Sequence, residues 1–165
     1  MIRIKNTFLL LTLLFVSACG YHVRGNLDLP EGLQNIYLQG GSGQLRQIIK
    51  ITLRSSDGKL VANIEDAGIV VKVTRENMRR RVTSTSSTGR ANEFELYYQL
   101  DFVLLDVKGK NLSEKQAIEI TRDYFNDQED ILGKNDEEQT IREEMYRQAV
   151  RTIFTRSRIA LEKVI

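Results

Sequence analysis

The sequence contains few of the residues from which catalytic and metal sites are built. Cys19 is the only cysteine and His22 the only histidine among 165 residues, and tryptophan is absent. A single cysteine excludes an intramolecular disulfide and any multi-cysteine zinc or iron–sulfur site. A Ser-His-Asp or Cys-His centre would depend on one imidazole close to the start of the chain. We therefore expect no enzyme, no metal site and no dissociable cofactor.

Proline and net charge are also scarce. The chain has one proline, and 41% of its residues are apolar and 28% charged, which suits one folded domain rather than a disordered or collagen-like chain. The net charge of +2 depends on Arg3 and Lys5, because without them the basic residues equal the 22 acidic ones. Such a chain has no overall attraction for nucleic acid, so we expect no nucleic-acid partner.

Residues 1–18 have the pattern of a secretory signal peptide. Arg3 and Lys5 precede an apolar run at residues 8–16, and two small residues follow before Cys19. A helix that spans a membrane needs about 20 apolar residues, and this run is about half as long. The segment is therefore predicted to target the chain rather than to span a membrane.

The sequence VSAC at residues 16–19 is similar to a bacterial lipobox, whose cysteine is acylated and becomes the mature N-terminus. We expect Cys19 to carry a diacylglycerol on its sulfur and an acyl chain such as palmitate on its nitrogen. Because each buried CH₂ contributes about 0.8 kcal/mol, three chains would hold the protein on the membrane. Gly20, in place of an aspartate, predicts sorting to the outer membrane. The alternative is an ordinary secreted protein with an unpaired cysteine.

Residues 19–32 have little hydrophobic periodicity, so we predict a lipidated tether there. The periodic pattern that follows predicts one domain at residues 33–165. The predicted strands are 34–38, 60–62, 69–82, 94–105 and 118–124, and the predicted helices are 45–53 and 135–161. The strongest pattern is the alternation at 94–104, where every even position is apolar, which indicates one buried face. The last three strands predict an antiparallel meander. Asn135 is predicted to cap the last helix. The acidic residues in the first turn of that helix would stabilise it by interacting with the positive end of the helix dipole.

Arginines flank a hydroxyl-rich run at residues 83–88, which we interpret as a solvated hairpin tip. They are Arg75, Arg79, Arg80, Arg81 and Arg90. Guanidinium groups bind phosphate in a bidentate manner, and in an outer-membrane lipoprotein the available polyanions are chiefly lipopolysaccharide phosphates. The alternative is a charged, solvated edge that prevents strands from aggregating. The sequence leaves both interpretations open.

Three further motifs carry a family resemblance that covers nearly the whole chain. They are CGYHVR at residues 19–24, EFELYY at 93–98, and RDYFND at 122–127 followed by ILGK at 131–134. In this order and spacing they resemble the LptE family, the RlpB-like lipopolysaccharide-assembly lipoproteins. The resemblance implies an α+β fold, with two helices packed on one face of a roughly four-stranded, largely antiparallel sheet.

The same resemblance implies a function. Family members sit as a plug inside the LptD barrel in the outer membrane, reached from the periplasmic side, and assist the transport and insertion of lipopolysaccharide. They also bind lipopolysaccharide through a basic residue just before the last helix, a position matched by Lys134. In the family, a second basic residue at the hairpin tip also contacts lipopolysaccharide. This chain has Ser86 and Ser87 at that tip, and its nearby basic residue is Arg90. The candidate lipopolysaccharide ligands are thus Lys134, Arg90, Arg79, Arg80 and Arg81.

Two other functions compete with this one. The chain could be another envelope adaptor, either a pilot lipoprotein for a secretin or a subunit of the barrel-assembly machinery, and the identity of its barrel partner would distinguish these. A lipid-anchored hydrolase is disfavoured, because the chain lacks the histidines, cysteines and metal ligands that its chemistry needs.

Overall fold

The structure of the chain is a computed structural model that describes residues 29–125 and 131–163. The predicted signal peptide, Cys19 and most of the predicted tether lie outside these ranges. In chain order the elements are α2 (Glu31–Gln34), β1 (Asn35–Gln39), α3 (Gly43–Arg54), β2 (Lys59–Leu60), the 3₁₀ helix η1 (Ile64–Asp66), β3 (Ile69–Thr85), β4 (Ala91–Leu105), β5 (Gln116–Phe125) and α4 (Ile131–Glu162).

The strands form one mixed sheet in the order β2-β1-β3-β4-β5. β1 is parallel to both β2 and β3, whereas β3, β4 and β5 pair antiparallel. The predicted meander and the predicted α+β class are therefore confirmed. The sheet has the five strands that the periodicity predicts, rather than the roughly four that the resemblance implies, because the two-residue strand β2 adds an edge next to β1.

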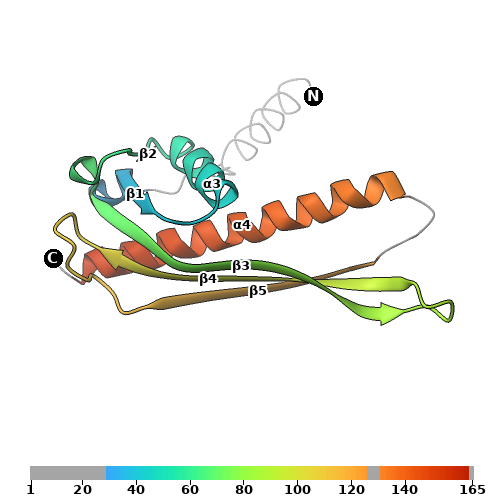
Figure 1. Cartoon of the computed structure of the whole chain (residues 1–165). Coiled ribbons are helices and arrows are strands. Elements are labelled where there is room, and N and C mark those ends of the chain that lie inside the picture. The colour runs from blue at the N-terminus through green and yellow to red at the C-terminus, as the bar shows by residue number, and fades with distance from the viewer. Residues whose placement is uncertain (1–28, 126–130, 164–165) are drawn as a thin grey trace, which may run out of the picture.

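The two long helices cover one face of the sheet, and no described helix covers the other (Figure 1). We call this uncovered surface the bare face. With 32 residues, α4 is about 48 Å long. The 15 residues of β4 extend about 50 Å, so the length of α4 nearly matches that of this strand.

The core lies between this helix layer and the sheet. Even-numbered residues of β4 face the helices, and those from Leu96 to Leu104 are completely buried. They pack against apolar residues of the long helices, including Leu45, Ile49 and Leu53 of α3 and Met145, Ala149, Val150 and Ile153 of α4. The alternation predicted for residues 94–104 is thus confirmed. The odd-numbered residues of β4 point to the bare face.

Two boundaries differ from the sequence prediction. α4 begins at Ile131, so Asn135 lies inside the helix and the prediction that it is the N-cap was wrong. The helix includes Gly133, and one glycine costs a helix only about 1 kcal/mol relative to alanine, which a 32-residue helix tolerates. β3 also continues to Thr85. The hairpin turn therefore includes only the second half of the hydroxyl-rich run, with Ser86 N donating to the Arg90 carbonyl at 2.7 Å.

Candidate functional site

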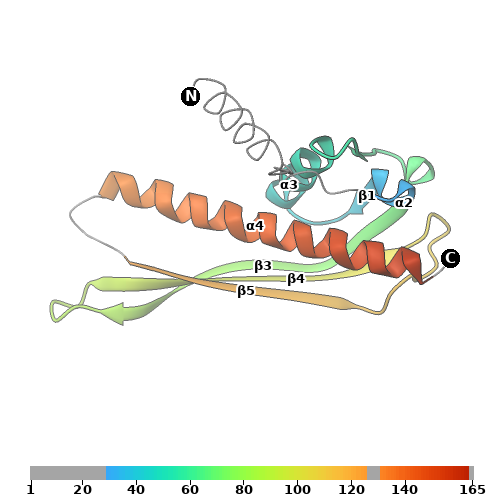
Figure 2. The same ribbon diagram turned by 180° about the vertical axis from the view of Figure 1, so that it is seen from behind.

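The β3–β4 hairpin and the first turns of α4 lie at the same end of the molecule. Figures 1 and 2 show the hairpin turn and the start of α4 at the same end of the molecule, opposite to α2. Arg79, Arg80 and Arg81, which we call the arginine segment, lie on β3 close to this turn. The tertiary structure therefore brings the arginine segment to the same end of the molecule as the first turns of α4, where Lys134 lies.

A β-bulge decides which way each arginine points. Val73 pairs with Phe102 of β4 and faces the helices, but the register shifts by one residue between Val73 and Arg75. An uninterrupted strand would turn Arg79 and Arg81 to the same face as Val73. Because of the bulge they point to the bare face instead, while Arg80 pairs with buried Leu96 and points to the helices.

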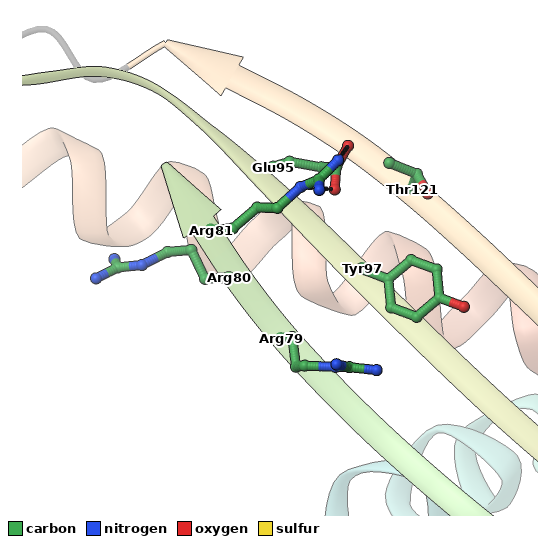
Figure 3. A pocket seen from close by; sticks show the side chains of 6 residues that line it. All are labelled: Arg79, Arg80, Arg81, Glu95, Tyr97 and Thr121. Atoms are coloured by element: carbon green, nitrogen blue, oxygen red, sulfur yellow. Dashed lines mark hydrogen bonds and ion pairs between the residues drawn. The ribbon is translucent and has the colours of Figure 1, made fainter. Parts of the chain in front are cut away.

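On the bare face, the arginine segment borders a depression of about 500 Å³ (Figure 3). Its lining comes from three neighbouring strands and consists of Arg79, Arg80, Arg81, Glu95, Tyr97 and Thr121. Figure 3 shows Arg79 and Arg81 extending from β3 across β4, towards Tyr97 and Thr121, and Arg80 leaving the opposite side of the strand. The depression therefore presents two guanidinium groups over a mixed aromatic and hydroxyl surface.

The two bare-face arginines have different neighbours. Nε of Arg81 lies 2.6 Å from Glu95 Oε1, and Nη2 donates to Oε2 at 3.0 Å, so the two side chains form a bidentate pair. This hydrogen bonding raises the pKa of Arg81 above its ordinary value. Cζ of Arg79 lies 5.6 Å from the ring centre of Tyr97, within the range of a cation–π contact. Both side chains are exposed, and within the described residues only the guanidinium of Arg81 is paired with a carboxylate.

On the helix face, Arg80 joins a network around Glu138 of α4. Its Nη1 lies 2.9 Å from Glu138 Oε2, and its guanidinium stacks over Phe94 at 4.6 Å from the ring centre. The same carboxylate accepts hydrogen bonds from Tyr124 and from Arg142, whose Nη2 lies 2.6 Å away. Burial raises the pKa of Glu138, but these three donors outweigh it, so the pKa lies below its usual value. Arg80 therefore holds α4 against the sheet.

The remaining predicted residues are spread over the molecule. Arg75 is on the bare face, with Nε 4.0 Å from the buried Asp101 carboxylate, which also lies 2.9 Å from Nζ of Lys115. Arg90 is exposed and closes the hairpin turn through its backbone carbonyl and amide. Lys134 lies within the first turn of α4, but its side chain is outside the described part of the structure. Cys19 is outside the described residues altogether.

Sequence reasoning missed the groups that contact the arginines. The alternating pattern places Glu95 on the solvent-exposed face of its strand, Tyr97 enters only through the EFELYY motif, and Glu138 is predicted only as part of an acidic helix start. The missing signal is the pairing register, which sets Arg81 opposite Glu95 and Arg79 opposite Tyr97. Residues in different strands meet through that register, and it cannot be derived from the sequence of either strand alone.

A second polar cluster fastens α3 to β3. Glu76 accepts hydrogen bonds from the backbone N and the Oγ of Ser42, at 2.5 and 2.7 Å, and from the Tyr98 hydroxyl at 3.0 Å. Burial, and then the nearby Glu76 carboxylate, raise the pKa of Tyr98. The polar side-chain atoms of this cluster bond to one another, so we assign it a structural role.

The described residues contain neither a candidate metal site nor a membrane-spanning helix. Among residues 29–125 and 131–163, no group of three or more His, Cys, Asp or Glu side chains is placed to hold a metal ion. Within the same ranges, no helix combines the length and the hydrophobicity needed to cross a bilayer.

Comparison with known sequences gives a consistent result. A family model described as "LptE: Lipopolysaccharide-assembly" matches residues 33–157. The LPS-assembly lipoprotein LptE of Pectobacterium atrosepticum is 26% identical over 154 residues, which cover 92% of this chain and 83% of that protein. The LPS-assembly lipoprotein LptE of Photorhabdus laumondii is 24% identical over 156 residues, with the same coverage of 92% and 83%.

Solved structures show the same fold. The solution structure of an uncharacterized lipoprotein B from Nitrosomonas europaea matches with a TM-score of 0.64 and 26% identity, covering 87% of this chain and 96% of that chain. The crystal structure of the rare lipoprotein B from Shewanella oneidensis matches with a TM-score of 0.60 and 25% identity, covering 78% of this chain and 98% of that chain.

Proposed function

This chain belongs to the LptE family of lipopolysaccharide-assembly lipoproteins, and from that membership we propose that it is a non-enzymatic subunit that assists the transport of lipopolysaccharide and its insertion into the outer leaflet. It is anchored to the outer membrane by acyl chains on Cys19, with the folded domain on the periplasmic side. The lipobox-like VSAC motif at residues 16–19 supports the anchor.

Its protein partner in this proposal is the β-barrel LptD, which the chain plugs and whose assembly it supports. The elongated shape supports such a location, because α4 and the long strands run together along one axis (Figure 1). With a length of about 50 Å and one helix layer on one sheet, the domain is a narrow wedge suited to the lumen of a large barrel.

Lipopolysaccharide binds at the hairpin end in this proposal. The observation that carries it is the pair of accessible guanidinium groups of Arg79 and Arg81 over one depression, at the end of the molecule where α4 begins. Arg90 at the turn and Lys134 in α4 are further candidate ligands. These cations would compete with divalent metal ions for lipid A phosphates and so loosen lipopolysaccharide aggregates before insertion. No bond is made or broken.

The partner and the anchor are tested by purifying the chain from native outer membranes. We expect a large barrel protein in nearly equal amount, and mass spectrometry of the mature N-terminus should find a triacylated Cys19. Recovery of unacylated chain from periplasmic extract, with no barrel protein attached, would contradict the proposal.

The ligand is tested by binding to immobilised lipopolysaccharide at low and high salt. We expect the double variant Arg79→Ala/Arg81→Ala to bind roughly three- to tenfold more weakly and with a flatter salt dependence, because two cations that bind phosphate are lost. The matched control is Arg54→Ala/Arg151→Ala, which removes the same charge from exposed positions on α3 and α4. Equal binding by the two double variants would contradict a specific role for the arginine segment.

A further inference from the structure

We propose that the depression on the bare face is a binding site for a single phosphate group, in which Arg79 and Arg81 are the ligands and the Glu95 carboxylate is a built-in competitor that the phosphate displaces. The assignment of its natural ligand to lipopolysaccharide rests on the proposed function above. The site itself rests on the geometry of three neighbouring strands.

The spacing of the two arginines suits one phosphate. A β-strand rises about 3.3 Å per residue, so Arg79 and Arg81 leave β3 about 6.6 Å apart on the same face. A tetrahedral phosphate between them can accept hydrogen bonds of about 2.7 to 2.9 Å from both guanidinium groups. Thr121 of β5 adds a hydroxyl to the same depression, and the Tyr97 ring forms part of its lining. Three strands therefore contribute to one concave, cationic surface.

The two arginines are not equally available. Within the described residues, Arg79 forms no ion pair, and its recorded contact is with the Tyr97 ring. The guanidinium of Arg81 is held by Glu95, whose side chain is only 15% exposed, whereas that of Arg81 is 71% exposed. A ligand arriving from solvent thus meets Arg79 directly, and it must replace Glu95 to take the Nε–Nη2 edge of Arg81 that this carboxylate occupies.

Charge favours phosphate over a carboxylate in this exchange. A phosphate monoester carries a charge of about −1.5 to −2 at neutral pH and has three acceptor oxygens. An acidic side chain of a protein partner carries a single charge, as Glu95 already does, and would gain little by replacing it. Multiply charged anions therefore displace the Glu95 carboxylate from Arg81 more easily than single carboxylates do. Glu95 is thus the residue that determines the selectivity of the site.

The experiment titrates the full chain in detergent micelles with inorganic pyrophosphate while backbone amide signals are followed by NMR. We expect shifts at residues 79–81, 95–97 and 121, and the Arg79→Ala variant should lose them. Glu95→Gln should bind roughly three- to tenfold more tightly, because it removes the competing charge. Glu65→Gln, which changes the same charge on η1, is the matched control and should bind like the parent chain.

A second set of titrations identifies the source of the phosphate. It uses vesicles that contain lipid A with its phosphates, vesicles that contain the dephosphorylated lipid, and soluble polyaspartate. We expect only the phosphorylated vesicles and pyrophosphate to shift the amides of the site. Larger shifts with polyaspartate would overturn the proposal in favour of an acidic protein segment.

The outcomes separate this inference from the proposed function. If lipopolysaccharide binds but neither it nor pyrophosphate shifts residues 79–81, the site and the placement of lipopolysaccharide at the arginine segment are wrong, and the proposed role in lipopolysaccharide assembly stands. If pyrophosphate binds here but lipopolysaccharide does not bind, the site stands and its proposed natural ligand is wrong. If Glu95→Gln and Glu65→Gln bind equally, the role of Glu95 as a competitor is overturned.

Discussion

The carboxylate of Glu138 on α4 lies 2.9 Å from Nη1 of Arg80 on β3, although the two residues are 58 positions apart in the sequence. The contact joins the start of the last helix to the arginine segment. It also pairs the Arg80 guanidinium with a carboxylate on the helix face, although the Arg80 side chain stays 49% exposed. The hairpin end therefore contains one arginine that contacts α4 between two that point to the bare face.

The Glu138 network predicts a dependence of stability on pH. The pKa of Glu138 is lower in the folded state than the unfolded value of 4.5, so the ionised carboxylate stabilises the fold at pH values above 4.5. This stabilisation is lost as the pH falls through the lower folded-state pKa. Glu138→Gln should reduce the free energy of unfolding by about 1 to 2 kcal/mol at pH 7. The difference from the parent chain should shrink as pH falls below 4.5.

Urea unfolding at a series of pH values measures this difference. The control is Glu144→Gln, an exposed residue of the same helix, which should change stability by no more than about 0.5 kcal/mol. A loss for Glu138→Gln that is the same at pH 7 and pH 3 would contradict the linkage to this carboxylate.

Tyr124 should contribute stability that is lost at high pH. Burial, and then its hydrogen bond to Glu138, raise the pKa of the hydroxyl from 10.0 to about 12. The neutral form is therefore favoured in the folded state, and its contribution is complete below pH 10 and disappears as pH rises through about 12. Tyr124→Phe should cost about 1 kcal/mol at pH 7, and the difference should narrow above pH 10.

The measurement combines urea unfolding with absorbance titration of the phenolate at 295 nm. Tyr37→Phe on β1 is the control for loss of a hydroxyl outside the Glu138 network. If Tyr124→Phe and the parent chain titrate identically between pH 10 and 12, the raised pKa does not belong to Tyr124.

Gly68 should not tolerate a side chain. A Cβ atom there would lie 2.4 Å from the carbonyl oxygen of Gly32, and that neighbour is backbone that cannot rotate away. Gly68→Ala should therefore destabilise the fold by about 1 to 3 kcal/mol, as overpacking typically does. At Gly43, the first residue of α3, a Cβ would meet nothing within 4 Å. Gly43→Ala should leave stability unchanged or raise it by up to about 1 kcal/mol. Equal midpoints in thermal unfolding would contradict this contrast.

Ser42 should stabilise α3 as its N-cap. Its Oγ accepts a hydrogen bond from the Leu45 backbone N at 3.1 Å and donates one to Glu76 Oε1 at 2.7 Å. Ser42→Ala should cost about 1 to 2 kcal/mol, because both bonds are lost at a partly buried site. Ser87→Ala in the exposed hairpin turn is the control, and a loss no greater than the control's would show that the cap is dispensable.

The fold could largely be predicted because its main elements have strong local patterns. The alternation of residues 94–104 specifies a strand with one buried face, and the three- and four-residue spacing of Leu45, Ile49 and Leu53 specifies a helix. The start of α4 could not be predicted, because tertiary packing outweighs the unfavourable local preference of Gly133.

The residues alone specify a cationic hairpin, a lipobox-like start and an almost neutral chain. They do not specify which arginines face solvent, because side chains alternate along a strand and a single inserted residue reverses every face that follows. The bulge after Val73 turns Arg79 and Arg81 to the bare face. Pairing with β4 then places Tyr97 opposite Arg79 and Glu95 opposite Arg81. The tertiary structure therefore decides that Arg80 points to the helix face and contacts Glu138 while Arg79 and Arg81 point to the bare face, because strand register depends on contacts between strands.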